Sequence, residues 1–267
     1  TGTGNWTLQP FTTTRDIQFG GADNAGALLD LASDELALLP AAPASLTIGR
    51  SNGTGTLTIA DDLDYGSVPL NLRAGSIAQT GSLTADDPSL LANGGTIVLT
   101  NAANDLGAIA ISGTPTAVSI TDTTEITQDG AWVLGAANLT LDASGNNITL
   151  EQATNTFGTV SLDGADASIV ENASTDLGAS TLANLTVVSA DAISTSGTLT
   201  VSTKGDFETR KDGGASITIA NNSEIAEISA ESRNAADNAN AAGDITISLA
   251  ESATLDQITT TGTTTLT

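Results

Sequence analysis

The chain is built from short triplets in which two apolar residues flank one Thr or Ser. Such triplets begin at positions 46, 57, 118, 139, 148, 160, 185, 199, 217 and 245. Alternation with a period of two is typical of a β-strand with one buried face. Gly, Asn, Asp and Ser, which favour turns, separate the triplets. The pattern predicts an all-β fold with many short strands.

The chain also repeats itself. The segment "IVLTNAANDLGAIAISG" at 97–113 returns 51 positions later as "ITLEQATNTFGTVSLDG" at 148–164, and triplets at 97, 118, 139 and 160 follow a spacing of 21. Internal similarity of this kind is typical of a solenoid. We therefore expect about 10 to 13 irregular coils of about 20 to 26 residues. Four residues are expected to form one inward ladder: Leu99, Ile120, Leu141 and Leu162. An antiparallel sandwich is the alternative fold.

The repeated segment suggests roles for its polar residues. Asn104 and Asn155 are expected at coil corners, where their amides bond neighbouring backbone groups. Gly107 and Gly158, three residues further on, are expected to adopt a positive φ there. Loop excursions are expected near 204–214 and 231–244, and a short helix is expected to begin near Asp34.

Charge and composition exclude several functions. The chain has 31 acidic and 7 basic residues, and its formal net charge is −24. Nucleic acid and anionic membrane surfaces are therefore disfavoured partners, because both require clustered Lys and Arg. No stretch approaches the roughly 20 apolar residues of a membrane-spanning helix. The absence of His and Cys excludes a Ser-His-Asp triad, a Cys nucleophile and the common zinc sites.

Carboxylates are the remaining candidates for catalytic groups and metal ligands. Acidic residues close in the sequence could in principle serve as acid and base in a polysaccharide-active enzyme: Asp61, Asp62 and Asp64, Asp86 with Asp87, and Asp163 with Asp166. Sugar-cleaving clefts usually present aromatic platforms, however, and the few aromatic residues are scattered, so no enzyme is expected. Asp61, Asp62 and Asp64 are also a calcium candidate, because hard cations prefer several carboxylate oxygens. A solvated turn is the competing interpretation, and no other cofactor is expected.

Seven Asn-x-Ser/Thr sequons are glycosylation candidates, although several are expected by chance in a chain so rich in Asn, Ser and Thr. They begin at Asn5, Asn52, Asn138, Asn147, Asn172, Asn184 and Asn221.

Three stretches resemble the rod repeats of the filamentous-haemagglutinin type of large secreted adhesin, which is exported by two-partner secretion. They are "LASDELALL…LTIGRSNGTGTLTIADDL" at 31–63, "LNLRAGSIAQTGSLTA" at 70–85 and "GGTIVLTNAANDLG" at 94–107. The resemblance implies a right-handed parallel β-helix on the bacterial cell surface. The family's amino-terminal secretion domain, with its Asn-Pro-Asn motifs, is absent, so an internal rod segment covering 1–267 as one domain is expected.

Together these observations predict a non-enzymatic extracellular rod with a structural or adhesive role. Its expected partner is a glycan or protein receptor on a host or neighbouring cell. The first alternative is a self-assembling filament subunit, because exposed strand edges favour end-to-end association. The second is the polysaccharide-active enzyme. The spread of acidic residues also predicts that salt stabilises the fold.

Overall fold

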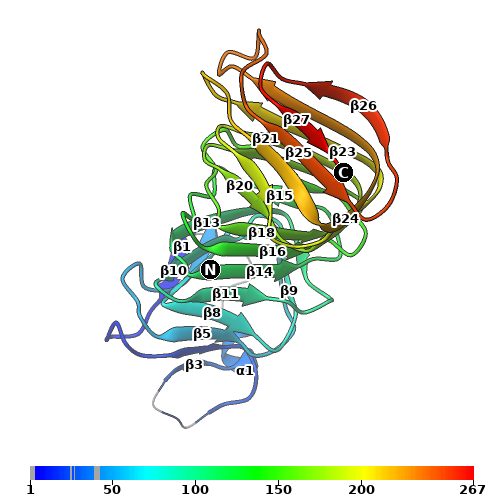
Figure 1. The fold of residues 1–267 in the computed structure, drawn as a ribbon. Coiled ribbons are helices and arrows are strands. Elements are labelled where there is room, and N and C mark those ends of the chain that lie inside the picture. Colours follow the sequence, from blue (N-terminus) through cyan, green and yellow to red (C-terminus); the bar gives the residue numbers. More distant parts are fainter. Residues whose placement is uncertain (1–3, 25, 27, 39–42) are drawn as a thin grey trace. The chain divides into compact units, whose positions relative to one another are not determined.

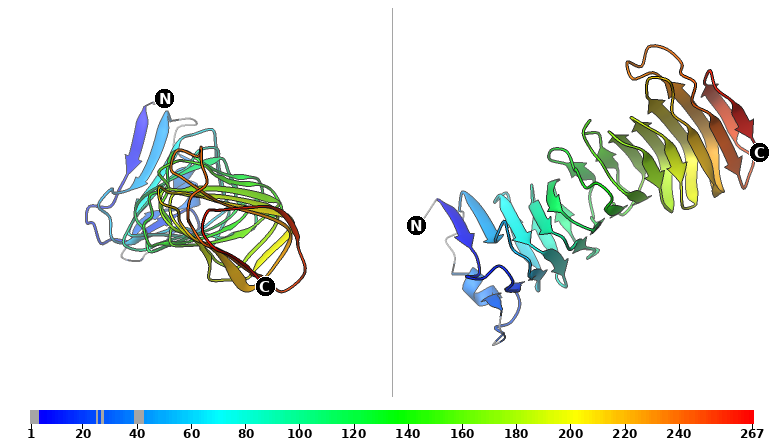
Figure 2. Two further views of the ribbon diagram at one scale, coloured as in Figure 1. Left: turned by 45° about the horizontal axis from the view of Figure 1, so that its top comes forward. Right: turned by 60° about the vertical axis from the view of Figure 1, so that its left-hand side comes forward.

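The computed structural model describes residues 4–24, 26, 28–38 and 43–267. Apart from one four-residue helix, the regular secondary structure of these residues is β-strand, and the strands pair in parallel. The chain divides into two compact units, residues 1–130 (unit 1) and 131–267 (unit 2). Each unit is a stack of parallel coils, visible as successive rungs in Figures 1 and 2. The predicted parallel β-helix is confirmed, with about 11 turns across the described residues. That both units form one continuous domain stays a prediction.

Unit 1 contains fifteen of the described strands and one short helix. They are β1 (Asn5–Leu8), β2 (Ile17–Phe19), β3 (Leu29–Leu31), α1 (Ser33–Leu36), β4 (Ser45–Gly49), β5 (Thr56–Ile59), β6 (Leu63–Gly66), β7 (Leu70–Ala74), β8 (Ser76–Gln79), β9 (Leu83–Ala85), β10 (Ser89–Asn93), β11 (Thr96–Leu99), β12 (Asp105–Leu106), β13 (Ala108–Thr114), β14 (Ala117–Thr121) and β15 (Ile126–Gln128).

Each central coil of unit 1 gives one strand to each of three parallel sheets. One sheet pairs β1, β4, β7, β10 and β13. A second pairs β2, β5, β8, β11 and β14, and the third pairs β6, β9 and β12. In the second sheet Leu57 lies over Ile77, which lies over Ile97. Each of these steps advances 20 residues, one fewer than the spacing of the triplet series and at the lower end of the expected coil length of about 20 to 26 residues.

Unit 2 contains the remaining twelve strands. They are β16 (Asn138–Asp142), β17 (Ile148–Leu150), β18 (Thr159–Asp163), β19 (Asp166–Glu171), β20 (Thr175–Leu177), β21 (Ser180–Ser189), β22 (Ile193–Thr195), β23 (Leu199–Arg210), β24 (Ile217–Arg233), β25 (Ile245–Leu249), β26 (Thr254–Thr259) and β27 (Thr264–Leu266).

Long strands in unit 2 take part in two sheets at once. The start of β21 continues the pairing of β18, whereas its second half pairs with β19 along residues 184–189. The strand β23 pairs with β21 along almost its whole length. The pairing is interrupted once, where the register shifts between Leu182 and Asn184. The strand β24 similarly pairs with both β25 and β26. A bend within one strand therefore replaces a turn between two strands.

The predicted ladder residues all face inward. Leu99 lies over Ile120 in unit 1, and Leu141 lies over Leu162 in unit 2. None of the four side chains is more than 2% exposed. Burying a Leu or Ile side chain contributes about 1.5–3 kcal/mol, so these stacked aliphatic residues are the main source of stability in each unit.

The bounds of the two predicted loop excursions require correction. The excursion expected near 204–214 is shorter, because β23 continues to Arg210 and only the residues between β23 and β24 leave the sheet. The excursion near 231–244 begins after Arg233. The short helix predicted to begin near Asp34 is confirmed as α1, Ser33–Leu36, and the backbone N–H of its N-cap residue Ala32 donates to Glu35 Oε2.

Candidate functional site

Asn104 joins three successive coils of unit 1. The residue is fully buried. Its Oδ1 accepts the backbone N–H of Leu83 from the preceding coil at 2.9 Å. Its Nδ2 donates to Leu99 O in its own coil at 3.2 Å and to Thr121 O in the next coil at 3.0 Å. The predicted corner role is confirmed: the amide satisfies backbone groups that the corner would otherwise leave unpaired.

Asn155 repeats this arrangement in unit 2. The residue is also fully buried. Its Oδ1 accepts the Trp132 N–H at 2.9 Å, and its Nδ2 donates to Leu150 O and Val170 O, both at 3.1 Å. The similarity between 97–113 and 148–164 therefore preserves a connection between coils, and these asparagines serve the fold rather than a ligand.

The prediction that the two corner glycines adopt a positive φ is wrong, although both positions do require glycine. Neither Gly107 nor Gly158 has a positive φ. A Cβ on Gly107 would instead lie 1.3 Å from Asp86 O, and a Cβ on Gly158 would lie 2.5 Å from Ala136 O. The preceding coil approaches so closely that no side chain fits, so the glycine is required for space rather than for backbone conformation.

Two of the three calcium candidates join neighbouring segments, and the third accepts a hydrogen bond within its own turn. Asp61 Oδ2 accepts the Ser33 hydroxyl at 2.6 Å. Asp62 Oδ1 accepts both the backbone N–H and the hydroxyl of Ser82 in the next coil, at 2.7 and 2.9 Å, and these bonds lower the pKa of the Asp62 carboxyl. Asp64 Oδ1 accepts the Gly66 N–H at 3.0 Å. Among the described residues, no three His, Cys, Asp or Glu side chains converge as metal ligands. Calcium binding here stays a prediction.

The other acid pairs considered for catalysis lie at turns. Asp163 ends β18 and Asp166 begins β19, so the two residues stand on different strands on either side of a turn. Asp166 Oδ1 accepts a hydrogen bond from Asn184 Nδ2 at 2.7 Å. Asp86 and Asp87 lie between β9 and β10, and both are exposed. None of these carboxylates is paired with a nucleophile by a hydrogen bond that the structure shows.

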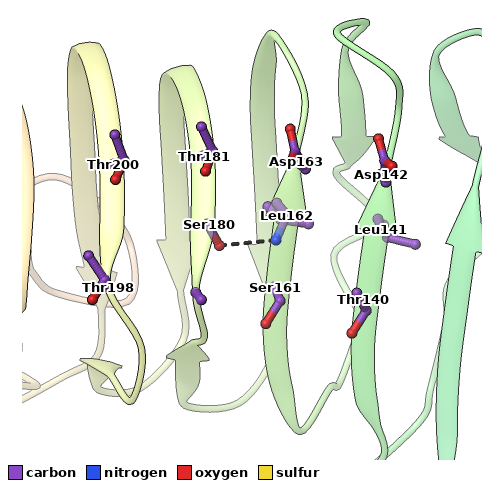
Figure 3. A pocket seen from close by; sticks show the side chains of 11 residues that line it. Thr140, Leu141, Asp142, Ser161, Leu162, Asp163, Ser180, Thr181, Thr198 and Thr200 are labelled. Atoms are coloured by element: carbon purple, nitrogen blue, oxygen red, sulfur yellow. Dashed lines mark hydrogen bonds between the residues drawn. The ribbon is translucent and has the colours of Figure 1, made fainter.

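A groove of about 460 Å³ lies on the outer face of unit 2 (Figure 3). Two rows of short side chains line it. One row holds Asp142, Asp163, Thr181 and Thr200, and the other holds Thr140, Ser161, Ala179 and Thr198. Successive residues of a row come from successive coils, which are about 4.8 Å apart. The surface is thus a regular array of hydroxyl groups with two carboxylates at one end.

An interruption in strand pairing lies at the centre of the groove. The first residues of β18 pair with β20, whereas Asp163 at its end pairs with Thr181 of β21. At this change of partner the backbone N–H of Leu162 donates to Ser180 Oγ at 3.0 Å, and the same hydroxyl donates to Gly178 O at 3.2 Å. The Ser180 hydroxyl thus takes the place of a backbone group in the hydrogen bonding between strands. The residues beside it are small, so the depression stays open.

Asp142 and Asp163 are neighbours in register on β16 and β18. Sequence reasoning considered Asp163 with Asp166 and missed this pair. The signal was present, because each residue comes directly after a triplet of the 21-residue series. No Lys, Arg or aromatic side chain lines the groove. Hydroxyl and carboxylate groups in two rows suit hydrogen bonding to a neutral, hydroxyl-rich ligand.

The basic residues of unit 2 lie elsewhere and are paired with acids. Ion pairs between exposed or half-exposed side chains stabilise little, so these pairs chiefly compensate charge. The contacts are Lys204 with Asp256 at 2.6 Å, Lys204 with Glu227 at 3.6 Å, Arg210 with Glu208 at 2.6 Å, Arg210 with Asp237 at 3.2 Å, Lys211 with Asp191 at 2.8 Å, Arg233 with Asp237 at 3.0 Å and Arg233 with Glu231 at 3.8 Å.

The sequon asparagines lie on the surface. Six of the seven are exposed, and Asn184 is half-buried. Some already hold hydrogen bonds: Asn184 Nδ2 donates to Asp166, and Asn221 Nδ2 donates to Thr195 O. Attachment of a glycan at these two positions would break those bonds. Glycosylation at any of the seven stays a prediction.

Comparison with known proteins identifies a repeat family. A search of curated proteins and a search of solved structures each found no significant match. Within the described residues no helix has the length and apolar character needed to cross a bilayer. A family model of repeats matches three successive segments, residues 39–112, 105–163 and 164–225. Since these matches cover most of the chain, the protein belongs to the family described as Repeats of unknown function (DUF5649).

Proposed function

We propose that this chain is a non-enzymatic structural solenoid with an adhesive role, and that the groove of Figure 3 is its contact surface for a glycan. The observation that carries the proposal is the two-row array of hydroxyls and carboxylates. Its residues come from four coils, so a ligand that follows the rows contacts several coils at once. Such a ligand is neutral and polyhydroxylated, because the groove offers carboxylates without a compensating cation.

The interior supports a structural role. The buried polar groups Asn104 and Asn155 bond backbone on neighbouring coils, and the buried aliphatic residues stack on their counterparts. The groove is open and shallow, and none of its hydroxyls is paired with a base in the way that nucleophilic catalysis requires. A β-solenoid fold alone does not specify a function, so the proposal rests on the groove.

The proposed setting is the outside of a bacterial cell, with a glycan or protein receptor on a host or neighbouring cell. Its support is the resemblance of 31–107 to adhesin rod repeats, together with a charge of −24 that favours a well-solvated surface. Two-partner secretion belongs to the same proposal.

A glycan array probed with the purified chain tests the adhesive role. We expect binding to neutral glycans and at least a tenfold loss for Asp163→Asn combined with Thr181→Val. Asp129→Asn, an exposed aspartate in unit 1, is the matched control and should bind like the wild type. Absence of binding to any glycan or cell surface, or equal binding by groove and control variants, would refute the proposal.

A filament subunit is the second candidate. Leu255 and Leu266 are 48% and 44% exposed and line a cavity of about 320 Å³ with Ile247 and Leu249. Exposed aliphatic ladders and strand edges favour association between copies. Electron microscopy distinguishes the two candidates, because fibres should form from the wild type and disappear in Leu255→Glu. Turnover of a glycan that is lost in Asp142→Asn would instead support the enzyme alternative.

A further inference from the structure

The basic residues of unit 1 gather at one corner of its coils. Arg15 lies in the turn between β1 and β2, Arg50 begins the turn between β4 and β5, and Arg73 lies near the end of β7, just before β8. These strands stack in register, so the three arginines belong to three successive coils on the same side. Unit 1 has no other Lys or Arg. We call this region the arginine corner; it comprises residues 9–16, 49–55 and 73–75.

Contacts between coils bring the segments of the arginine corner together. Gly49, the residue before Arg50, is in register with Arg73. The Arg50 guanidinium reaches the turn between β1 and β2, where its Nη1 donates to Pro10 O and Phe11 O, both at 3.2 Å. The three arginines therefore lie on adjoining segments, and one extended ligand can contact all of them.

The arginine corner is positive in a strongly acidic chain. It contains three Arg and one Asp, whereas the whole chain has 31 acidic and 7 basic residues. Within the described structure the side chains of Arg15 and Arg73 form no hydrogen bond or ion pair, and Arg50 bonds only neutral groups. The one acid, Asp16, accepts a backbone N–H of the next coil. In unit 2, by contrast, each Lys and Arg has an acidic partner.

The two sheets that meet at the arginine corner carry no acidic residue. Neither the sheet of β1, β4, β7, β10 and β13 nor the sheet of β2, β5, β8, β11 and β14 contains Asp or Glu in these strands. The acids of unit 1 lie instead in β3, α1, the third sheet and the connecting segments. Since charges more than about 10 Å apart are largely screened at 0.1 M salt, the arginines dominate the field that an anion meets at this corner.

An exposed aromatic ring belongs to the same corner. Phe11 is 95% exposed, although Pro10 beside it is buried. The carbonyls of both residues accept hydrogen bonds from Arg50, so the backbone is held where the ring projects into water. A phenyl ring offers an apolar face to a sugar ring, and a guanidinium matches the two oxygens of a carboxylate. The corner thus offers both contacts that an acidic sugar requires.

We propose that the arginine corner binds a carboxylated glycan, a polysaccharide whose sugars carry one carboxylate each. Arg15, Arg50 and Arg73 donate to carboxylates of neighbouring sugars, and Phe11 packs against a sugar ring. A ligand with one charge per sugar is favoured over nucleic acid, because the net charge of −24 repels ligands of higher charge density more strongly. The site is independent of the groove proposed for neutral glycans, since it lies in the other unit and selects ligands of negative charge.

Fluorescence polarisation with a labelled oligogalacturonate tests the proposal, and the methyl ester of the same oligosaccharide, which lacks the charges, is the ligand control. The wild type should bind the acid and not the ester, and binding should weaken as NaCl rises from about 0.05 M to about 0.5 M. Arg15→Gln combined with Arg73→Gln should weaken binding about tenfold, because two exposed ion pairs are lost. Neither side chain makes a hydrogen bond within the described structure, so this variant should fold like the wild type.

Arg210→Gln combined with Lys211→Gln is the matched control, because it removes the same charge from unit 2; it should bind like the wild type. The groove variant, Asp163→Asn with Thr181→Val, should also bind oligogalacturonate normally, so this site and the groove are tested separately. Binding of the ester as tight as that of the acid, no binding of either, or an equal loss in the control variant would overturn the proposal. The comparison of acid and ester on the wild type decides even if a variant fails to fold.

Two other occupants would also overturn the proposal. Single-stranded DNA that binds as tightly as oligogalacturonate would show that the corner attracts any polyanion. Self-association that disappears in the variant of Arg15 and Arg73, without binding of oligogalacturonate, would identify an acidic surface of a second copy as the occupant.

Discussion

Replacement of Asn155 by Ala tests how much one corner amide contributes to the stacking of coils. The substitution removes at least three hydrogen bonds at once: the one accepted from Trp132 N–H and those donated to Leu150 O and Val170 O. These partners lie in the preceding coil, the same coil and the following coil. Truncation therefore disturbs both interfaces of a coil through a single residue.

The expected cost is about 4 kcal/mol. A buried donor or acceptor left without a partner costs about 1–3 kcal/mol, which for three groups sums to about 3–9 kcal/mol. The lower part of this range applies, because a water molecule can enter the space of the lost amide and each carbonyl has a second lone pair. Since domains are stable by only about 5–15 kcal/mol, the variant should be severely destabilised.

Urea denaturation followed by circular dichroism measures this cost. Asn172→Ala is the control, because Asn172 is exposed, and its substitution should cost less than about 0.5 kcal/mol. A loss below about 1.5 kcal/mol for Asn155→Ala would refute the reasoning, since it would show that neighbouring groups replace the amide.

Asn155→Asp separates the hydrogen bonds from side-chain volume. The carboxylate can still accept from Trp132, but it faces the two carbonyl oxygens without donors. Burial and these carbonyls should raise the pKa of the new acid, so the variant should lose stability as the pH rises from 4 to 8. Stability equal to the wild type at pH 8 would contradict this account.

The ladder and the corner asparagines could be predicted from the sequence because both recur at a fixed spacing. Leu99, Ile120, Leu141 and Leu162 occupy one position of successive triplets, and a period of two places that position inside. Stacking coils impose their geometry on each repeat, so a periodic signal carries long-range information that single strands lack.

Other features escaped prediction for physical reasons. The segment Lys204–Arg210 resembles a loop by composition, yet its charged residues alternate with Gly205, Phe207 and Thr209, which face inward, and its charges find partners on other rungs. Burial of Glu171, which ends β19 and is 1% exposed, could not be inferred, because a lone acid is exposed in most proteins. The pairing of Asp142 with Asp163 follows from the same 21-residue spacing as the ladder, but it is missed when acidic residues are paired by closeness along the chain.

Three further predictions concern packing and charge. Leu141→Ala should cost about 2–5 kcal/mol in urea unfolding, because it opens a cavity in the ladder; a loss under 1 kcal/mol would contradict the inward placement. Gly107→Ala should cost clearly more than Gly145→Ala, although only Gly145 has a positive φ, because the new Cβ collides with Asp86 O at 1.3 Å whereas the space around Gly145 is open; equal costs would show that the coils can separate. Salt should stabilise the chain, because a net charge of −24 brings acids on neighbouring coils into repulsion, and screening shortens the Debye length from about 10 Å at 0.1 M to about 3 Å at 1 M salt. The melting temperature should therefore rise up to 1 M NaCl and rise further in millimolar Ca²⁺, and the calcium increment should shrink when the three aspartates between positions 61 and 64 are changed to Asn. A melting temperature that is flat in NaCl would show that the acids are too dispersed to oppose folding, and a calcium increment unchanged by the substitutions would mean that the ion binds diffusely.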